Sequence, residues 1–556
     1  MAKSRTQRLA GRIVDLEARR EYPGYVEWRT GRIVRVVADP AVRSRQLIMP
    51  GLVDAHVHIE SSLLPPAEFA RLAVVHGTVA TVSDPHEIAN VLGAPGVRYM
   101  VRDGRRTPLR FTFGAPSCVP ATTFETAGAA LSAPDVARLL ADPAIRYLAE
   151  VMNFPGVLGG DPALRAMMAA ANRLGKPIDG HAPGLRGAQA RAYAAAGPST
   201  DHECFTLAEA KDKLAAGMKI LIREGSAARN FAALEPLLKS HPARVMFCCD
   251  DLHPDRLLEG HIDRHVRRAL AGGADRFDVL RCASLNPIEH YGLDVGRLRP
   301  GDPADFIVVD GWRRFRVQAT YLRGDLAAAG GRSRLPRLRS ATPNRFRARP
   351  RVPADFAVKA PLATTPRRTV NVIAALNGQL ITRHLTADLR VRGGVLLPDV
   401  RRDVLKIAVV NRYAPLAPVA VGFIQGFGLR AGAIASSVAH DSHNIVAVGV
   451  DDAALAQAVN LVIRHRGGLS VTGPRGDAVL PLPIAGLMSD RPGRLVARRY
   501  TALDRAAKRL GSRLDAPFMT LSFMALLVIP DLKLSDRGLF SASRWGFVPV
   551  AGPAAR

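Results

Sequence analysis

Short apolar runs alternate with helical patterns through the first half of the chain. Between Gly51 and about Gly292, each apolar run ends in polar or charged residues, and an amphipathic segment follows it. Repeated strand-then-helix units at this spacing predict an α/β fold, namely a (β/α)8 TIM-like barrel over residues 51–292. The strand-type runs are LVDAHVHIE, VATVSDPHE, LRFTFGAPS, IRYLAEVMN, PIDGHAPG, MKILIREGS and RVMFCCDD.

Two β-type segments flank this barrel. Residues 10–50 contain short strand-type patterns at Tyr25 to Trp28 and at Arg32 to Val37. After the barrel, VGRLRPGDPADFIVVD has a similar pattern. Because the two segments lie on either side of the barrel in sequence, we expect them to pair. The expected unit is a composite β-sandwich of residues 1–50 and 293–326.

The rest of the chain divides into a connector and another domain. Residues 327–352 are rich in Arg, Pro and Ser and predict an exposed linker. Residues 353–556 predict an additional C-terminal α+β domain, with strand-type runs TVNVIAAL, DVLKIAVVN and NIVAVGV and a helix at Ala453 to His465. The apolar run from Phe518 to Ile529 lies between two prolines and is too short to cross a bilayer. We expect it to be a buried strand or helix.

The net charge is unusual, although the overall composition is that of a globular protein. Of the 556 residues, 48% are apolar and 23% charged, and Lys plus Arg number 77 against 49 acidic residues, a formal charge of +28. Such an excess often indicates a surface for nucleic acid or anionic membranes. Only ten of the basic residues are lysines, and the arginines are spread over most of the length. We therefore interpret the charge as a compositional trait as much as a binding surface.

The cysteines indicate a reducing environment. There are five, an odd number, and none stands in a CxxC pair, so neither a disulfide framework nor a structural zinc site is indicated. The N-terminal sequence MAKSRTQRLAGRIVDLEARREYPGY has no apolar core of a secretory signal. We expect a cytoplasmic protein.

The strongest chemical signal is the pair His56 and His58 in IMPGLVDAHVHIESS. On a strand, residues i and i+2 point to the same side, so these two imidazoles can bind one divalent metal. An isolated HxH pair is weak evidence. However, His181 in DGHAPG, His202 in STDHE and Asp250 in RVMFCCDD each follow a strand-type run. Together the five residues predict a metal cluster at the strand ends of the barrel.

Glu150 is the candidate for a bridging ligand. Barrel hydrolases with two metals need an anionic group between the ions, often a carboxylated lysine on a middle strand. After Lys3, the next lysine is Lys176, which lies in a helix-to-strand turn. Glu150 ends the run IRYLAE, between the HxH pair and His181, and can supply the carboxylate instead. The alternative is a buried carboxylate paired with one of the many arginines.

Other polar residues follow the same strand-type runs. They could position a substrate, move protons or hold an additional metal, or they could be caps and turns of loops. Glu203, beside His202, is an acid candidate only if its strand has already ended, because neighbouring residues on a strand point to opposite sides. The remaining candidates in the barrel are Glu60, Ser61, Asp84, His86, Glu87, Asn90 and Asp251.

In the C-terminal block, the segment VAHDSHN places His440, Asp441 and His443 ahead of the apolar run IVAVGV. Two structures are compatible with this pattern. One is the N-terminal cap of a helix, and the other is a loop that covers or completes the mouth of the barrel.

These motifs also carry a family resemblance. PGLVDAHVHIESS and PGDPADFIVVD resemble the amidohydrolase superfamily. Together with SDPHEIANVLG, PSCVPATTFE, AEVMNFPGV, DGHAPGL, DHE, IREGSAARN, FCCDD and SVAHDSHNIVAVG, they are similar to the bacterial adenine deaminase family over nearly the whole chain. The resemblance implies hydrolysis of adenine to hypoxanthine and ammonia. It also implies a divalent metal cofactor, two ions of manganese or iron, and a small purine substrate.

Roles follow from the matching positions. His56 and His58 match the first-strand ligands, Glu150 the bridging carboxylate, and His181 and His202 the next two strand ends. Asp250 matches the last-strand aspartate, although the adjacent Asp251 leaves the choice between the two open. The run TVATVSDPHE and the arginine-rich linker depart from the family pattern without removing a ligand.

The mechanism we expect begins with a metal-activated hydroxide that attacks the 6-carbon of the purine. Asp250 would move the proton of the attacking water toward the departing amine. Glu87, Glu203 or a histidine at the mouth would protonate a ring nitrogen.

Two other functions would also account for parts of this sequence. Another amidohydrolase, acting on a related aminopurine or a cyclic amide, would share the fold and ligands. A nucleic-acid-binding protein would explain the charge, but the sequence contains no evident recognition helix, zinc finger or RNA-binding signature. We expect no specific nucleic-acid or membrane partner, and a homo-oligomer.

Overall fold

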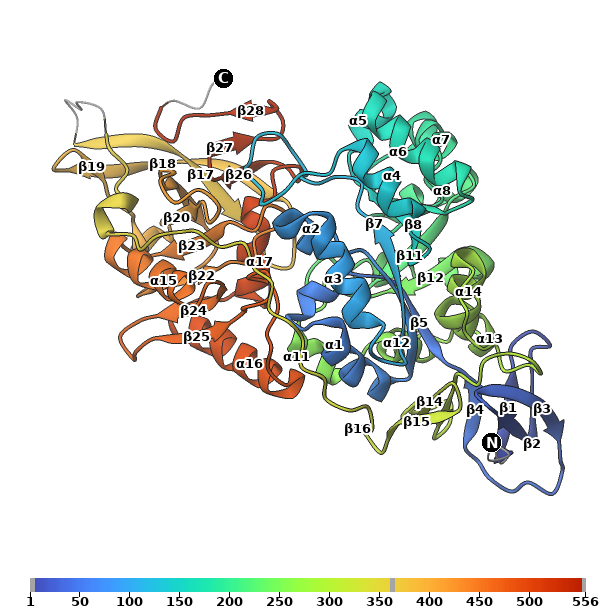
Figure 1. Ribbon diagram of the computed structural model, residues 1–556. Coiled ribbons are helices and arrows are strands. Elements are labelled where there is room, and N and C mark those ends of the chain that lie inside the picture. Colours follow the sequence, from blue (N-terminus) through green and yellow to red (C-terminus); the bar gives the residue numbers. More distant parts are fainter. Residues whose placement is uncertain (1–5, 361–365, 553–556) are drawn as a thin grey trace.

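The computed structural model describes residues 6–360 and 366–552. Residues 1–5, 361–365 and 553–556 fall within the predicted ranges 1–50 and 353–556, and they lie outside the described residues, as does Lys3. Figure 1 shows a small β unit at one end, a central barrel and a C-terminal domain at the other end. Within the described ranges, every helix is too short or too polar to span a bilayer.

The two flanks of the barrel join in one eight-stranded sheet with the order β16-β15-β14-β13-β4-β1-β2-β3. β4, the last strand of the N-terminal flank, makes the junction, because it pairs parallel to β1 and antiparallel to β13. Trp28 packs against Phe306 at the centre of this unit, with ring centroids 5.2 Å apart. The sheet continues past residue 326. Its strands are β1 (Gln7–Asp15), β2 (Arg20–Arg29), β3 (Arg32–Ala38), β4 (Leu47–Pro50), β13 (Phe306–Val309), β14 (Val317–Leu322), β15 (Asp325–Ala329) and β16 (Arg332–Ser333).

Eight parallel strands, β5 to β12, form the barrel. They occur as a five-stranded sheet, β5 to β9, and a three-stranded sheet, β10 to β12. The two sheets meet where the backbone N–H of Ser199 donates to the oxygen of Ile178. The strands are β5 (Leu52–Val57), β6 (Thr78–Ser83), β7 (Arg110–Ala115), β8 (Ile145–Val151), β9 (Ile178–Gly180), β10 (Thr200–Asp201), β11 (Lys219–Arg223) and β12 (Val245–Cys248).

The barrel closes between its first and last strands. The backbone N–H of Asp250 donates to the oxygen of His56 at 2.9 Å, and the N–H of His58 donates to the oxygen of Asp250 at 3.3 Å. This closure confirms the predicted (β/α)8 fold and places the chemistry-bearing segments of β5 and β12 side by side. The barrel interior is filled by a separate cluster: Ala55, Val82, Tyr147, Ala149, Leu221, Met246, Cys248 and Tyr291.

Helices surround the barrel because each presents one apolar face to the strands. α4 begins with a capping box in which Ser132 and Asp135 satisfy each other's backbone N–H groups. α6 begins at Pro162 with Asp161 as its cap. The principal outer helices are α1 (Pro66–Ala73), α3 (Ala94–Gly104), α4 (Ala133–Ala141), α6 (Pro162–Arg173), α7 (Gly187–Ala195), α8 (Leu207–Ala215), α12 (Ile262–Ala271) and α14 (Asn286–Tyr291).

The predicted linker has no regular structure from residue 336 to 352, and it runs along the protein surface between the two large domains. It is partly anchored. Arg345 donates to the oxygen of Gly128 in the barrel, Arg351 donates to the oxygen of Ala417, and Phe346 is buried in the C-terminal domain.

The C-terminal domain is built on a nine-stranded mixed sheet, in the order β19-β18-β17-β21-β20-β23-β22-β24-β25. The predicted strand-type runs become β17, β20 and β23, and the predicted helix becomes α15 (Asp452–Arg464). Its strands are β17 (Arg367–Ala375), β18 (Thr382–Arg392), β19 (Val395–Leu396), β20 (Leu405–Val410), β21 (Ala420–Gln425), β22 (Ala433–Ser436), β23 (Ile445–Gly449), β24 (Gly468–Thr472) and β25 (Ala478–Pro481).

The predicted apolar run near the C-terminus is buried from Phe518 to Leu527 and partly buried at its last two residues. It forms α17 (Pro517–Ser522), a short 3-10 turn (Phe523–Ala525) and an irregular segment to Ile529. A small sheet of β26 (Leu532–Ser535), β27 (Gly538–Ser541) and β28 (Gly546–Phe547) follows it. The long helix α16 (Gly493–Arg509) packs beside α11 (Pro254–Glu259) of the barrel. The C-terminal domain therefore lies against the barrel directly.

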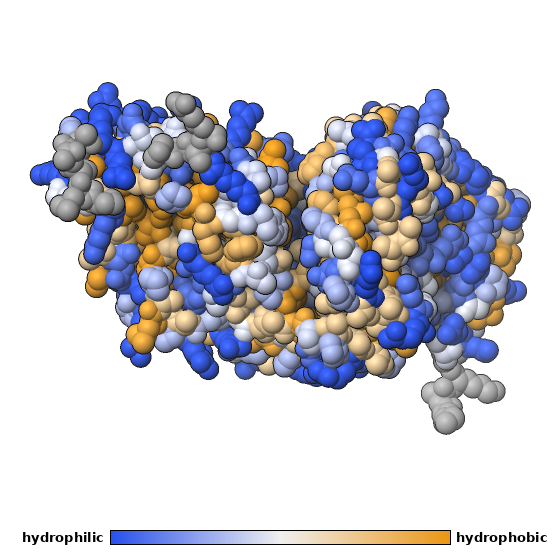
Figure 2. Space-filling model, turned by 90° about the horizontal axis from the view of Figure 1, so that it is seen from above, coloured by the Kyte–Doolittle hydropathy of each residue, from blue (hydrophilic) through white to orange (hydrophobic). Residues whose placement is uncertain are grey.

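Seen from above, the surface is hollowed between the C-terminal domain and the barrel (Figure 2). Hydrophilic residues are scattered over both lobes on this face and do not gather into one stripe.

Candidate metal centre and active site

The barrel closure brings His56, His58 and Asp250 together. The Nε2 atoms of the two histidines are 3.2 Å apart, and Oδ1 of Asp250 lies 3.5 Å from Nε2 of His56 and 3.2 Å from Nε2 of His58. All three side chains are buried. Nδ1 of His58 faces the backbone oxygen of Asp84 at 3.2 Å. Because that oxygen can only accept, the proton of His58 lies on Nδ1, and Nε2 keeps its lone pair for a metal.

Glu150 lies at the centre of the cluster. Its Oε1 is 3.4 Å from Nε2 of His58 and 3.3 Å from Nδ1 of His86. Its Oε2 is 2.6 Å from Nδ1 of His181 and 3.3 Å from Nε2 of His202. In the described chain, the ion-pair partners of Glu150 are thus histidines and not the arginine that the alternative required. His86 reaches the same carboxylate, although the sequence placed it only at the mouth.

Both central carboxylates are held in the charged form. Burial raises the pKa of Glu150, but the facing histidines, His181 foremost, outweigh burial and hold the pKa well below its usual range. For Asp250, burial also raises the pKa, and the charge of Arg223 outweighs it. A carboxylate is the form that binds a cation.

The donor set fits a divalent metal. Imidazole nitrogens and carboxylate oxygens that converge in a buried space are typical ligands for ions such as zinc, manganese and iron. The candidate ligand atoms fall into overlapping groups that each lie within 4.8 Å. These groups are His58, Asp84, His86 and Glu150; His56, His58 and Asp250; and His56, Glu150 and His202.

Arg223, at the end of β11, lines the same cavity and was not among the predicted site residues. Its guanidinium contacts both oxygens of Glu203, and Nη1 lies 2.6 Å from Oδ2 of Asp250. β10 ends at Asp201, so the side chain of Glu203 is free to turn into the cavity. A signal for Arg223 existed. It follows Leu221 by two residues on one strand, and Leu221 packs inside the barrel.

The two neighbouring aspartates are separated by their partners. Oδ1 of Asp250 faces the first-strand histidines, whereas Oδ1 of Asp251 accepts a hydrogen bond from the hydroxyl of Ser61. Asp251 lines the cavity wall without facing the histidine pair. The geometry therefore favours Asp250 as the last-strand ligand.

Two predicted residues support loops and do not line the cavity. Oε1 of Glu60 accepts a hydrogen bond from the N–H of Ile88 at 3.2 Å, and Asn90 donates to the oxygen of His86 at 3.0 Å. Burial raises the pKa of Glu60 to about 7. Both residues hold the segment that carries His86 in place.

A loop of the C-terminal domain, between β22 and β23, completes the barrel mouth. Nδ1 of His440 contacts Oε1 of Glu87, and Nε2 of His443 contacts Oε2 of the same carboxylate. Oδ1 of Asp441 lies 3.7 Å from Nε2 of His86. Of the two structures compatible with VAHDSHN, the covering loop is the one observed.

The same domain supplies an apolar wall to the cavity. This wall is formed by the buried run near the C-terminus and by the loop that precedes β18. Sequence reasoning did not select its residues, because apolar side chains carry no chemical signature and their partner lies far away in sequence. The wall consists of Leu380, Phe523, Leu526, Val528 and Ile529.

Asp54 supports the cluster of candidate metal ligands through hydrogen bonds to the backbone. Its Oδ1 accepts hydrogen bonds from the backbone N–H groups of Cys249, at 3.0 Å, and His56, at 3.3 Å. Its Oδ2 lies 2.8 Å from Nε2 of His261. Burial raises the pKa of the Cys249 thiol well above its usual value, so this sulfur stays protonated. Asp54 therefore joins β5 to the residues after β12, beside the candidate ligands His56 and Asp250.

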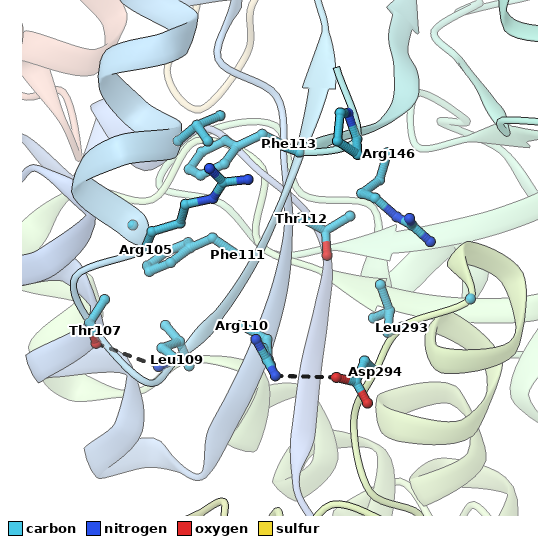
Figure 3. A pocket seen from close by; sticks show the side chains of 15 residues that line it. Arg105, Thr107, Leu109, Arg110, Phe111, Thr112, Phe113, Arg146, Leu293 and Asp294 are labelled. Atoms are coloured by element: carbon cyan, nitrogen blue, oxygen red, sulfur yellow. Dashed lines mark hydrogen bonds and ion pairs between the residues drawn. The ribbon is translucent and has the colours of Figure 1, made fainter. Parts of the chain in front are cut away.

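Another hollow lies at the opposite end of the barrel, where β7 and β8 begin (Figure 3). Arg105, Arg110 and Arg146 border it, and Arg110 pairs with Asp294 at 3.2 Å. Histidines and cysteines are absent from its lining. In barrels of this type, the end where strands begin serves stability.

Comparison with known proteins shows which families the chain is similar to. A family model described as "Adenine deaminase C-terminal domain" matches residues 379–545, and one described as "Amidohydrolase family" matches residues 47–327. An adenine deaminase of Salinibacter ruber is 57% identical, over 97% of this chain and 98% of that protein. Adenine deaminases of Sulfurovum sp. and Methanosarcina mazei are 54% and 48% identical, over 96% and 97% of this chain and 98% of each relative.

Proposed function

Because this chain belongs to the adenine deaminase family of amidohydrolases, we propose that it hydrolyses adenine to hypoxanthine and ammonia. The observation that carries the proposal is the cluster around Glu150, in which strand ends of a closed barrel bring four histidines to one carboxylate. The cavity is also walled by apolar side chains, which suit a flat purine ring.

We propose two bound ions of manganese or iron. The residues that would hold them are His56, His58, Glu150, His181, His202 and Asp250. When bound, such ions supply Lewis acidity that makes a water nucleophilic near neutral pH.

The chain's own residues manage the proton of that water. Oδ2 of Asp250 is held by Arg223 at 2.6 Å, which leaves Oδ1 on the histidine side of the cavity. In this position Asp250 accepts a proton from the attacking water and returns it to the amine that leaves the 6-carbon. Glu203, fixed by the same guanidinium, holds Arg223 in place.

We also propose a cytoplasmic location and a homo-oligomer. A cytoplasmic location suits the five cysteines, all of which are free and buried. A homo-oligomer also remains a prediction, which size-exclusion chromatography with light scattering would measure.

The test is ammonia release from a panel of amines after purification with manganese. The panel contains adenine, other aminopurines, cytosine and a cyclic amide. We expect adenine to give the highest kcat/KM. Turnover of another amine with none of adenine would overturn the substrate assignment while leaving the metal site intact.

A further inference from the structure

Three contacts hold His440 in the wall of the cavity. Its backbone N–H donates to the oxygen of Ser522 at 3.0 Å, and its ring stacks on Phe523 with centroids 4.3 Å apart and an interplanar angle of 16°. Its Nδ1 contacts Oε1 of Glu87. Three contacts on three sides therefore fix the position and the rotation of the imidazole.

The other oxygen of Glu87 is held by His443, whose protonation is set by the backbone. The N–H of Ala439 donates to Nδ1 of His443 at 3.2 Å, so Nδ1 bears a lone pair and no proton. The proton of the neutral ring is then on Nε2, which donates to Oε2 of Glu87. A neutral histidine that binds a metal through Nε2 needs its proton on Nδ1. Glu87, His440 and His443 thus form a hydrogen-bond network, although their ligand atoms lie close enough for an ion.

This network leaves one nitrogen of His440 free. Nε2 of His440 is buried and has no hydrogen-bond partner among the described residues. The ring lines the same cavity as Glu150 and Asp250. Burial lowers the pKa of His440, but the charges of Glu87 and Asp251 outweigh burial and raise it to about 9. In the protonated ring, which these charges favour, the free position is an N–H donor.

The two carboxylates expected to act as acids are occupied. Glu87 accepts hydrogen bonds at both oxygens, and Glu203 has both oxygens on the guanidinium of Arg223. Neither has an oxygen free to carry a proton to a ligand. The oriented imidazole has what they lack, namely a proton and an open direction into the cavity.

We propose that His440, supplied by the C-terminal domain, is the catalytic acid that protonates the purine ring nitrogen beside the 6-carbon. Glu87 and His443 are positioning residues behind it. The inference rests on the proposed function, since it assigns a step of adenine hydrolysis.

The protons and electron pairs of this step balance. As water oxygen bonds to the 6-carbon, the π pair of the C6–N1 bond moves to N1, which takes the proton from Nε2 of His440. Asp250 takes one proton of the water. The C6–N6 bond then breaks, its pair goes to the amine with the proton from Asp250, and ammonia leaves. The remaining hydroxyl proton returns to His440 as the carbonyl of hypoxanthine forms, so the acid is regenerated.

The central test uses the full chain with His440→Ala, loaded with manganese. Loss of a general acid lowers kcat by about 10² to 10⁴-fold, whereas we expect KM to change by less than about threefold and metal content to equal that of wild type. Added imidazole should restore kcat by at least about tenfold, most effectively at pH values where imidazole is protonated. His241→Ala, at a partly exposed histidine outside the cavity, is the matched control and should behave as wild type.

A second variant, Glu87→Gln, examines the positioning residue. It keeps an oxygen for one imidazole but removes the charge that favours the protonated ring. We expect a smaller loss of kcat than with His440→Ala and a loss of activity at lower pH on the alkaline side of the profile. An unchanged alkaline limit would overturn the role of Glu87 as the partner that sets His440.

Three results would overturn the proposal itself. These are a kcat of His440→Ala within threefold of wild type, a rise in KM alone without imidazole rescue, or a third ion per chain that the substitution removes. Failure of wild type on adenine is a different outcome, because it contradicts the proposed function. The role of His440 is then measured on whichever aminopurine the wild-type enzyme converts.

Discussion

Every proposed metal ligand comes from a strand end of the barrel, whereas the apolar wall and His440 come from loops of the C-terminal domain. The barrel residues reach the cavity through short local geometry, since a parallel strand delivers its last residues to one rim. The C-terminal residues reach it only by docking of one domain on another. The two walls therefore differ in chemistry. The barrel wall needs only the fold of the barrel, whereas the C-terminal wall also needs the two domains to dock.

The largest expected effect comes from a substitution in the barrel wall. Glu150→Gln removes the charge that four histidines face, so we expect bound metal to fall below the wild-type amount and turnover to fall by roughly 10³-fold or more, because metal polarisation supplies several kcal/mol. Elemental analysis and ammonia release measure both. Glu68→Gln, at a buried carboxylate outside the cavity, is the matched control. Full metal content and turnover in Glu150→Gln would remove this residue from the site.

A second substitution in the barrel wall tests Arg223, which holds the carboxylate proposed to transfer the proton but is not itself a proposed metal ligand. Arg223→Met removes the cation that fixes Asp250 and Glu203, and we expect turnover to fall by about 100-fold, since a displaced catalytic group costs about that much. Arg223→Lys restores charge without the planar fork and should lie in between. Equal losses of turnover in both variants would show that the positive charge alone restores nothing, and that the planar guanidinium is required.

One buried lysine connects two parts of the C-terminal wall. Nζ of Lys533 donates to the backbone oxygens of Leu380, at 2.7 Å, and Phe523, at 2.9 Å, both in the apolar wall. Burial lowers the pKa of Lys533 to about 7. Between this pKa and the unfolded value near 10.4, the unfolded chain binds more protons at this residue, so the free energy of unfolding rises with pH.

The prediction is a difference between wild type and Lys533→Met. From pH 7 to pH 9, the free energy of unfolding of wild type should rise by about 2 kcal/mol relative to the variant, because one pH unit is worth at most about 1.4 kcal/mol. Denaturant titrations at three pH values measure it. Parallel pH dependences in the two proteins would contradict the lowered pKa.

The smallest expected effect concerns the apolar wall itself. Leu526→Ala shortens a buried side chain of that wall, and we expect KM to rise by about tenfold with metal content unchanged, since a buried leucine side chain contributes about 1.5 kcal/mol or more. Leu503→Ala, equally buried in α16, controls for lost stability. If both variants raised KM alike, the wall would have no specific contact with the substrate.

The sequence sufficed for the barrel, and for placing the proposed ligands at its rim, because both follow local rules. Alternation of apolar runs and helices predicted the strands, and HxH spacing placed His56 and His58 on one side. The absence of a suitable lysine pointed to Glu150, which the structure places among the histidines.

The same local rules could not predict the residues of the C-terminal wall. Leu380 and Phe523 are ordinary apolar residues in the sequence, and only tertiary docking brings them to the barrel. Arg223 was missed for a different reason. Arginine is so frequent in this sequence that one more carries little signal, although the spacing from Leu221 marked Arg223 as inward-facing. The orientation of His440 depends on Glu87, which lies 353 residues away in the chain.

The order of the two walls along the chain has a consequence for synthesis. A ribosome completes the barrel, and with it every proposed metal ligand, before it adds the loops that cover the cavity. At translation rates of about 5 to 20 residues per second, roughly 10 to 50 s separate the two events. During that interval the ligand cluster is open to the solution, so ions can enter a nascent enzyme that cannot yet enclose a substrate.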